Sequence, residues 1–313
     1  MITSIIKNTK RHIISLKDLT GQEVMEIVDR GIEHSKGLVE LGHQLKGQVV
    51  GIYFTKTSTR TRTSFSTAAM RLGANVIAYG PNDLQINTGE SIGDTMQVLS
   101  RMLDGLVVRT AGDPAVLRAF SQQQRMSVVN AMTADEHPTQ ALADLTTIKS
   151  HFGELSGLHI VYLGEGNNTA SALALAIAKF PNVKISFYTP KNYGIEPHFL
   201  KYAQEQAQGK NTVIEEFHDI ASLPKSADIV YTTRWQTTGT SKPDKNWREM
   251  FLPFAVTDQL MSKFPDAIFM HDLPAHRGEE VEASVIDGVK SIVFDQAENK
   301  AHSAKAVLEW TMR

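Results

Sequence analysis

Hydroxyl and guanidinium groups alternate in one short tract, Ser58-Thr59-Arg60-Thr61-Arg62. The apolar run 49–54, typical of a buried strand, precedes the tract, and 64–72 has the apolar spacing of a helix. Backbone N–H groups at a helix N-terminus bind anions, and arginine offers a planar pair of donors that matches phosphate. The tract therefore predicts an anion site, although by itself it suits a capped basic turn on the surface equally well.

Other candidate groups follow predicted strands farther along the chain. They are Arg109, at the end of an apolar run, His137, in front of Pro138-Thr139-Gln140, and the pair His271-Asp272. Open α/β sheets bind their ligands at the carboxyl ends of strands, so we expect these side chains near one site. Taken singly, each could equally be a packed histidine or a surface charge.

The turn Gly164-Glu165-Gly166-Asn167-Asn168 lies between a predicted strand and a predicted helix. It is similar to a dinucleotide-binding turn, so a nicotinamide-dependent enzyme is one hypothesis. Two features disagree, because the third glycine of that pattern is Thr169 and the next strand ends without an acid, at Tyr188-Thr189-Pro190. The turn still predicts a ligand site, in which the Asn168 amide could pair with a carboxylate or an amine.

Strand-like runs alternate with helical patterns almost throughout, which predicts an α/β fold with parallel sheets. The predicted strands are 49–54, 75–79, 105–109, 127–130, 158–163, 184–188, 229–232, 267–270 and 291–294. The predicted helices are 21–41, 64–72, 92–102, 114–123, 137–151, 170–179, 197–208, 257–264 and 301–312. We expect the helix 137–151 to join the two halves and the polar stretch 236–247 to form a mobile loop.

The composition is that of an ordinary globular protein. The chain has 313 residues, enough for two domains, and a net charge of -2 that gives no electrostatic case for nucleic-acid binding. It contains no cysteine, which excludes disulfides and thiolate metal sites and fits a reducing compartment. Segment 1–7 lacks a signal-peptide core and no apolar run reaches membrane-spanning length, so we expect a cytoplasmic protein without membrane contact. The histidines lack metal-ligand spacing, and neither a metal nor a cofactor is expected.

Together, these motifs resemble the aspartate/ornithine carbamoyltransferase family. The resemblance covers essentially the whole chain and rests on the order and spacing of 58–62, Gly89-Glu90-Ser91, Arg109-Thr110, His137-Pro138-Thr139-Gln140, His271-Asp272-Leu273-Pro274 and the closing run 294–300. It implies two doubly wound parallel-sheet domains joined by long helices. Residues 1–148, with helix 298–313 packing back on them, would bind carbamoyl phosphate, and residues 149–297 would bind the amino acid. It also implies a homotrimer whose active sites lie between subunits.

On this resemblance, the carbamoyl-phosphate site consists of Ser58, Thr59, Arg60, Thr61, Gln85, Arg109, His137, Gln140, Leu273 and Lys300. The first four would hold the phosphate, and Gln85 would reach the phosphate of a neighbouring subunit. Arg109 and His137 would donate to the carbonyl oxygen and stabilise an oxyanion. Gln140 and the backbone carbonyl of Leu273 would accept from the carbamoyl NH2. The expected catalytic groups are Arg60, Arg109, His137 and Asp272.

For the second substrate, the resemblance indicates Asn168, Thr233, Arg234, Gln236, Thr237 and Asp272. The ornithine branch has an acid where this chain has Thr233 and a cysteine where it has Asp272. Arg234 and Gln236 are instead similar to the arginine-x-glutamine that holds carboxylates in the aspartate branch. These exchanges would move negative charge across the pocket, where Asp272 could orient an ammonium or take its proton. Alternatively, Asp272 only pairs with Arg277 or another cation.

The overall pattern favours transfer of a carbamoyl group to ornithine or a related diamino acid. Aspartate and an N-modified amino acid are alternative acceptors. A hypothesis of another class is a catalytically idle relative that binds an anion or metabolite. The intact phosphate tract, together with Arg109, His137 and Gln140, argues against an idle protein.

Overall fold

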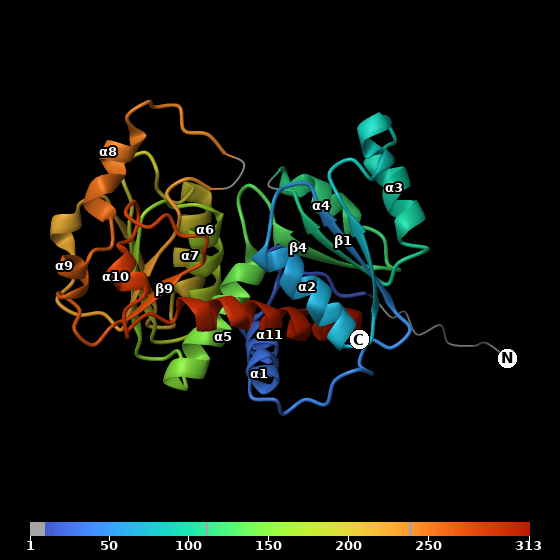
Figure 1. The fold of residues 1–313 in the computed structure, drawn as a ribbon, viewed down its shortest axis with the longest axis horizontal. Coiled ribbons are helices and arrows are strands. Elements are labelled where there is room, and N and C mark those ends of the chain that lie inside the picture. The colour runs from blue at the N-terminus through green and yellow to red at the C-terminus, as the bar shows by residue number, and fades with distance from the viewer. Residues whose placement is uncertain (1–9, 111, 238–239) are drawn as a thin grey trace.

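The computed structural model describes residues 10–110, 112–237 and 240–313. Segment 1–7 and positions 238–239 of the predicted mobile loop therefore lie outside the described residues. Two lobes stand side by side, each built on a parallel sheet packed among helices (Figure 1). This is the predicted α/β architecture of two doubly wound sheets. None of the helices in the described ranges is long and apolar enough to cross a bilayer.

All neighbouring strands are parallel, and each sheet reverses its chain order beside its first strand. The orders are β2-β1-β3-β4 and β7-β6-β5-β8-β9. The strands are β1 (Val49–Phe54), β2 (Asn75–Tyr79), β3 (Gly105–Arg109), β4 (Ser127–Met132), β5 (His159–Leu163), β6 (Lys184–Tyr188), β7 (Val213–Phe217), β8 (Ile229–Thr232) and β9 (Ile268–His271). The reversals lie between β1 and β3 and between β5 and β8, which is where open α/β sheets bind ligands.

Two long helices connect the lobes, and the other helices cover the sheet of one lobe or the other. The first lobe carries α1 (Gly21–Ser35), α2 (Arg60–Arg71), α3 (Ile92–Leu99) and α4 (Pro114–Phe120), with the turns η1 (Leu16–Asp18) and η2 (Gln85–Thr88). The second carries α6 (Asn168–Ile177), α7 (Pro197–Ala207), α8 (Trp247–Phe251), α9 (Asp258–Met261) and α10 (Ala283–Ile286), with η3 (Ile220–Ser222) and η4 (Leu252–Phe254). The connecting helices are α5 (Pro138–Phe152) and α11 (Val293–Met312). From the second lobe, α11 runs beneath the first and packs against α1, α2 and α5 (Figure 1).

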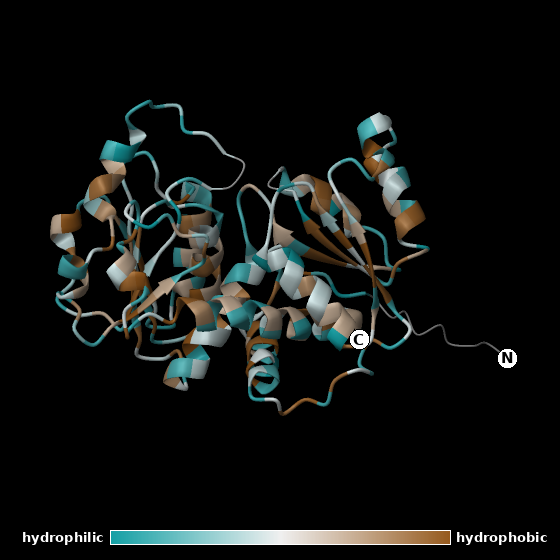
Figure 2. Ribbon diagram, in the orientation of Figure 1, coloured by the Kyte–Doolittle hydropathy of each residue, from teal (hydrophilic) through white to brown (hydrophobic). Residues whose placement is uncertain are grey.

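Apart from the edge strands β2 and β7, the strands are buried and apolar, because helices cover both faces of each sheet. Figure 2 shows brown strands between helices whose outer faces carry teal residues. The runs that form β3 and β4 are buried along their whole length. α5 is also buried over 138–148, and its Thr146 and Thr147 hydroxyls are satisfied by donating to backbone carbonyls one turn earlier at 2.8 Å. The central position of α5 fixes the two sheet edges relative to each other.

The predictions differ from the structure at two strands, at two short helices and at several helix bounds. The predicted helix 21–41 ends at Ser35, α11 begins at Val293 and not at 301, and α8 and α10 were not predicted. β7 was not predicted, because this edge strand is mostly half-exposed and carries Glu215 and Glu216 in place of an apolar alternation. The predicted strand 291–294 is wrong, since α11 begins at Val293 and only Ser291 makes a β-bridge, to Phe269. A short apolar run does not by itself distinguish a strand from the first turn of a helix.

Candidate active site

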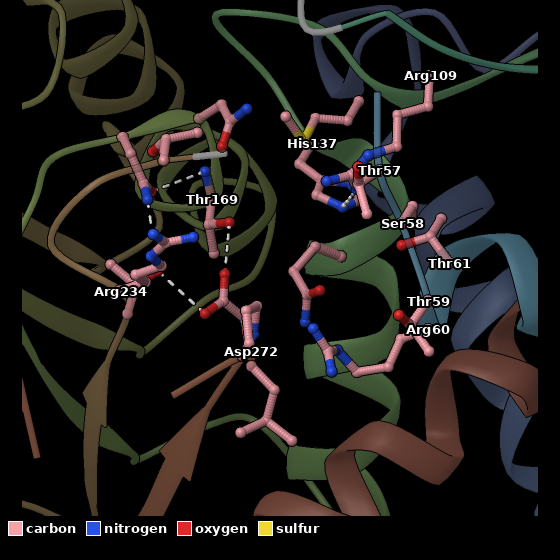
Figure 3. A pocket seen from close by; sticks show the side chains of 18 of the residues that line it. Thr57, Ser58, Thr59, Arg60, Thr61, Arg109, His137, Thr169, Arg234 and Asp272 are labelled. Carbon is pink, nitrogen blue, oxygen red and sulfur yellow. Dashed lines mark hydrogen bonds between the residues drawn. The ribbon is translucent and has the colours of Figure 1, made fainter. Parts of the chain in front are cut away.

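A cleft between the lobes gathers nearly all of the expected site residues. Its volume is about 390 Å³, the scale of a small-molecule site, and side chains of both lobes face each other across it (Figure 3). The lining residues are Thr57, Ser58, Thr59, Arg60, Thr61, Arg109, Met132, His137, Gln140, Asn167, Asn168, Thr169, Thr233, Arg234, Gln236, Thr237, Asp272, Leu273, Pro274 and Lys300. Of the expected residues, only Gln85 is missing from this set. It is exposed in η2, where its Oε1 accepts from the Thr88 hydroxyl at 2.6 Å.

Sequence reasoning missed several lining residues. These are Thr57, Met132, Asn167, Thr169 and Pro274. Each of them adjoins a predicted site residue or a strand end in the sequence, so the rule that ligands lie beyond the carboxyl ends of strands could have found them. Asn167 caps α6 by accepting from the N–H groups of Thr169 and Ala170.

The tract after β1 forms one wall of the cleft. α2 begins at Arg60, and its N-cap residue Thr59 makes no side-chain capping bond, so that hydroxyl is available to a ligand. The unpaired N–H groups of the first turn and the positive end of the helix dipole favour an anion here. Burial lowers the pKa of Arg60, and the nearby Asp272 carboxylate opposes that shift. This wall therefore has the donors and charge that a phosphate requires.

Arg109 ends β3 and His137 is the N-cap residue of α5, and the two lie side by side, with Arg109 Nη1 3.5 Å from His137 Nε2. Burial lowers the pKa of Arg109 to about 10, so the guanidinium is charged at neutral pH. Burial, with Lys300 and Arg109 nearby, holds the pKa of His137 well below its usual value. The imidazole is therefore neutral and can donate from one ring nitrogen. Two such donors, without a carboxylate between them, suit a developing oxyanion.

The opposite wall is built around the Asp272 carboxylate. The Thr169 hydroxyl donates to its Oδ2 and the Thr233 hydroxyl to its Oδ1, both at 3.0 Å (Figure 3). The alternative that Asp272 pairs with Arg277 is wrong, because Arg277 donates to both oxygens of Asp287 at 2.5 and 2.8 Å. The expected movement of charge across the pocket is also wrong. Since positions 233 and 272 are hydrogen-bonded to each other, their side chains occupy neighbouring points on one wall.

The other residues expected to bind the second substrate differ in the hydrogen bonds that they already make. Arg234 lines the cleft, and its Nε has no hydrogen-bond partner among the described residues. Gln236 Nε2 donates to the carbonyl of Thr240 at 2.8 Å. Asn168 joins the lobes, since its Nδ2 donates to the Thr133 carbonyl at 2.8 Å and its own carbonyl accepts from the N–H of His137 at 3.1 Å. Arg234 thus brings a positive charge to this side of the cleft, with its Nε buried.

The loop predicted to be mobile is anchored at Lys242. This ammonium pairs with Glu165 in the turn after β5, and the Lys242 side chain is only 3% exposed. Its Nζ lies 4.5 Å from the ring centre of Tyr193, 5.3 Å from that of Trp247 and 4.8 Å from that of Phe251. The other oxygen of Glu165 accepts from the N–H and hydroxyl of Thr237, at 3.2 and 3.0 Å. Glu165 therefore holds both ends of this loop segment.

The turn after β9 is held by a buried histidine. The N–H of Leu273 donates to His271 Nδ1 at 2.8 Å, so the ring proton lies on Nε2, which faces Glu280 Oε1 at 3.2 Å. Leu273 is thereby kept at a φ of 53°, uncommon for a residue other than glycine. His276, Glu279 and Glu280 also bring possible metal-ligand atoms within 4.8 Å of one another. Glu280 Oε1 already accepts from His271 and the N–H of His276, so its evident role is to hold this turn.

Chain packing explains the glycine pair after β5. A Cβ on Gly166 would lie 2.2 Å from the backbone of Gly194 and Ile195, and its N–H donates to the carbonyl of Tyr193 at 2.8 Å. Gly164 has a φ of 113°, which side-chain-bearing residues rarely adopt. These glycines therefore allow a tight contact between two chain segments, which accounts for them without a pyrophosphate.

The carboxyl-end edges of the two sheets face each other across the cleft. Between them lie a helix N-terminus that can bind an anion, two arginines and a neutral imidazole. This arrangement defines an α/β enzyme for a small anionic substrate. Comparison with known proteins gives the particular family. Residues 11–150 match the model "Aspartate/ornithine carbamoyltransferase, carbamoyl-P binding domain", and residues 156–311 match "Aspartate/ornithine carbamoyltransferase, Asp/Orn binding domain". The chain belongs to the aspartate/ornithine carbamoyltransferase family, and it is a carbamoyltransferase.

Relatives and solved structures agree with this assignment along the whole chain. The ornithine carbamoyltransferase of Symbiobacterium thermophilum is 40% identical over 306 residues, covering 96% of this chain and 98% of that protein. That of Thermococcus kodakarensis is 38% identical over 313 residues, with 98% of each chain covered. The structure of ornithine carbamoyltransferase from Pyrococcus furiosus superposes with a TM-score of 0.89 at 36% identity, covering 97% of both chains.

Proposed function

We propose that this carbamoyltransferase acts on ornithine or a related diamino acid. The observation that carries the proposal is a pair of opposite charges on the wall built around Asp272, here called the acceptor wall. Asp272 lies between two threonine hydroxyls, and Arg234 lines the same cleft. An α-amino acid offers the complementary pair, an ammonium for Asp272 and a carboxylate for Arg234. A second amine on the same molecule remains free to attack. Relatives named ornithine carbamoyltransferase, at 40% identity, support this choice.

The donor half follows from the opposite wall. Ser58, Thr59, Arg60 and Thr61, with the first N–H groups of α2, would bind the phosphate of carbamoyl phosphate. Arg109 and His137 would donate to its carbonyl oxygen. The carbonyl oxygens of Gln140 and Leu273 would accept from its NH2, and Lys300 would supply further positive charge beside Gln140.

The transfer requires no covalent intermediate with the protein. The acceptor amine enters as the free base, its lone pair forms the C–N bond, and the carbonyl electrons move onto oxygen. Arg109 and His137 stabilise that oxyanion by hydrogen bonds that strengthen as charge develops. The C–O bond to phosphate then breaks, and the surplus proton on nitrogen leaves with the phosphate. Holding both substrates in one cleft supplies the orientation that the direct attack needs.

Aspartate is the second candidate acceptor. Arg234 and Gln236 lie two positions apart on the acceptor wall and could bind a carboxylate, as in the aspartate branch. With a single-amine substrate, Asp272 would face the attacking amine and take its proton. The two candidates therefore give Asp272 different partners.

Several further features belong to the proposal. Residues 1–148 with 298–313 would form the carbamoyl-phosphate domain, and 149–297 the amino-acid domain. The assembly would be a homotrimer in which Gln85, exposed in η2, reaches the site of a neighbouring subunit. The cytoplasmic location stays a prediction.

Phosphate release from carbamoyl phosphate tests the proposed acceptor. The panel would contain ornithine, 2,4-diaminobutyrate, 2,3-diaminopropionate, aspartate and N-acetylornithine. We expect release with a diamino acid and little with N-acetylornithine, whose α-nitrogen carries no charge for Asp272. Faster release with aspartate would favour the second candidate, and no release with any amine would favour an idle relative.

A further inference from the structure

We propose that Asp144, which lies outside the cleft, fixes the orientation of the Gln140 amide and thereby lets the site distinguish a carbamoyl group from an acetyl group. The inference rests on the proposed function, in which the Gln140 oxygen accepts from the carbamoyl NH2. Asp144 is thus a positioning residue that acts through Gln140.

Three side-chain donors converge on Asp144, which is fully buried on α5. Gln140 Nε2 and Gln296 Nε2 each donate to its Oδ1 at 2.8 Å. The Tyr231 hydroxyl donates to its Oδ2 at 3.0 Å. These donors come from α5, α11 and β8, so both lobes meet at this carboxylate. An ionised carboxylate only accepts hydrogen bonds, and it therefore faces the NH2 end of both amides.

The opposite end of each amide is fixed as well. The Lys300 ammonium, which can only donate, bonds to Gln140 Oε1. Gln296 Oε1 accepts the backbone N–H of His271 at 2.9 Å. Turning either amide over would set donor against donor and acceptor against acceptor. Gln140 therefore lines the cleft with its oxygen on the Lys300 side, and that oxygen keeps a second lone pair for a ligand.

This orientation has a consequence for the donor substrate. A carbamoyl NH2 and an acetyl CH3 have nearly the same size, but only the NH2 can donate to the Gln140 oxygen. With the amide turned over, the NH2 of Gln140 would face the NH2 of the substrate, and the preference would disappear. Asp144 therefore determines this preference, although none of its atoms contacts the substrate.

A matched pair of stable analogues tests the proposal. Phosphonoacetamide carries the NH2, and acetonylphosphonate replaces it with CH3, so the ratio of their dissociation constants, measured by calorimetry, isolates this contact. In Asp144→Asn we expect the preference for phosphonoacetamide to fall roughly threefold to tenfold, the worth of one hydrogen bond, with acetonylphosphonate binding unchanged. Tyr231→Phe removes the donor to Oδ2 but leaves the bond to Gln140, and it should keep the wild-type ratio. In a Gln140→Ala background, Asp144→Asn should not change the ratio.

Equal weakening of both analogues in Asp144→Asn would overturn the proposal, as would a changed ratio in the Gln140→Ala background or in Tyr231→Phe. The assay needs no acceptor, so it separates the two claims. A wild type that binds neither analogue would contradict the proposed function, whereas a wild type that binds both with a ratio indifferent to Asp144 contradicts only this inference.

A measurement on the wild type covers the case in which Asp144→Asn does not fold. Burial raises the pKa of Asp144 to about 6, and the charged or titratable groups around it are Lys300, Asp272 and Tyr231. Burial lowers the pKa of Lys300 to about 8, so this lysine keeps its proton below neutral pH. Both analogues carry the same phosphonate, whose titration cancels in the ratio. The preference for phosphonoacetamide should decline as the pH falls from 7 to 5, and a constant ratio would contradict the role of Asp144.

Discussion

The Thr233 hydroxyl donates to Oδ1 of Asp272 at 3.0 Å. Two positions separated by 39 residues in the sequence therefore serve one point on the acceptor wall. A carboxylate at either position would present its charge to nearly the same place in the cleft. The neutral residue at 233 and the acid at 272 together keep one negative charge on this wall, as the ammonium of the proposed substrate requires.

The charge on this wall should determine the affinity for the acceptor. We expect Asp272→Asn to raise the acceptor KM roughly 10- to 100-fold, because a charged hydrogen bond to the ammonium is lost. The double variant Thr233→Asp/Asp272→Asn should recover most of that loss. Steady-state kinetics with the best amine of the panel measures both. Calorimetry with phosphonoacetamide is the control, and a large loss of its affinity would mean that Asp272 acts on the donor instead.

Arg109→Ala and His137→Ala should each lower kcat roughly 10²- to 10³-fold, since each removes a donor to the oxyanion. Single-turnover kinetics at saturating substrates would isolate the chemical step. A defect confined to the KM for carbamoyl phosphate would show that these groups bind the ground state only.

His137 should also remain neutral at physiological pH, because burial and the neighbouring cations Lys300 and Arg109 hold its pKa well below the usual value. In ¹⁵N-labelled protein, its ring signals should not titrate between pH 6 and 8. Titration of His137 near pH 6.5 would contradict the burial argument.

Lys242→Met should weaken acceptor binding by loosening the anchored loop. The substitution removes the cation between Glu165 and the aromatic rings and leaves the carboxylate without its buried partner. We expect the acceptor KM to rise about tenfold or more, while phosphonoacetamide binds as before. Lys245 is exposed in the same loop, so Lys245→Met is the matched control and should be neutral. Equal effects of the two variants would exclude an anchoring role for Lys242.

Stability should depend on pH through Glu136. Burial raises its pKa from 4.5 to about 7, although the Leu16 N–H and the Ser15 hydroxyl both donate to it. A raised carboxyl pKa means that the stability it contributes is fully present below about pH 4.5 and is lost as the pH rises through about 7. Between these two pH values, the free energy of unfolding of Glu136→Gln should therefore rise by on the order of 3 kcal/mol relative to that of wild type.

Urea unfolding at pH 4.5 and 7.5 measures this difference. Asp144, whose pKa is also raised, changes the free energy of unfolding in the same direction over an overlapping pH range. Both proteins contain Asp144, so its contribution cancels in the comparison. The exposed Glu154 provides the control Glu154→Gln, which should follow wild type at both pH values. Parallel curves for wild type and Glu136→Gln would show that Glu136 titrates normally in the fold.

Much of the site could be predicted because its residues follow strands that the sequence reveals. Arg109 ends an apolar run, the tract from Ser58 follows another after three intervening residues, and Asp272 directly follows a third. In parallel sheets, the carboxyl ends of strands meet at one edge, so the order of elements alone brings these residues together. The same local patterns fail at β7 and at 291–294, where partial exposure or a short apolar run leaves the type of element ambiguous.

The sequence by itself determined the α/β class, the family of the enzyme and the tract that we propose for the phosphate, because strand periodicity and motif order are local properties of the chain. Only the tertiary structure decided how polar groups pair. Asp144 meets Gln296 across 152 positions, Glu165 meets Lys242 across 77, and Arg277 chooses Asp287 over Asp272. Such pairings depend on which side chains are buried together when the lobes pack, and a buried polar group must find its partner there or lose stability.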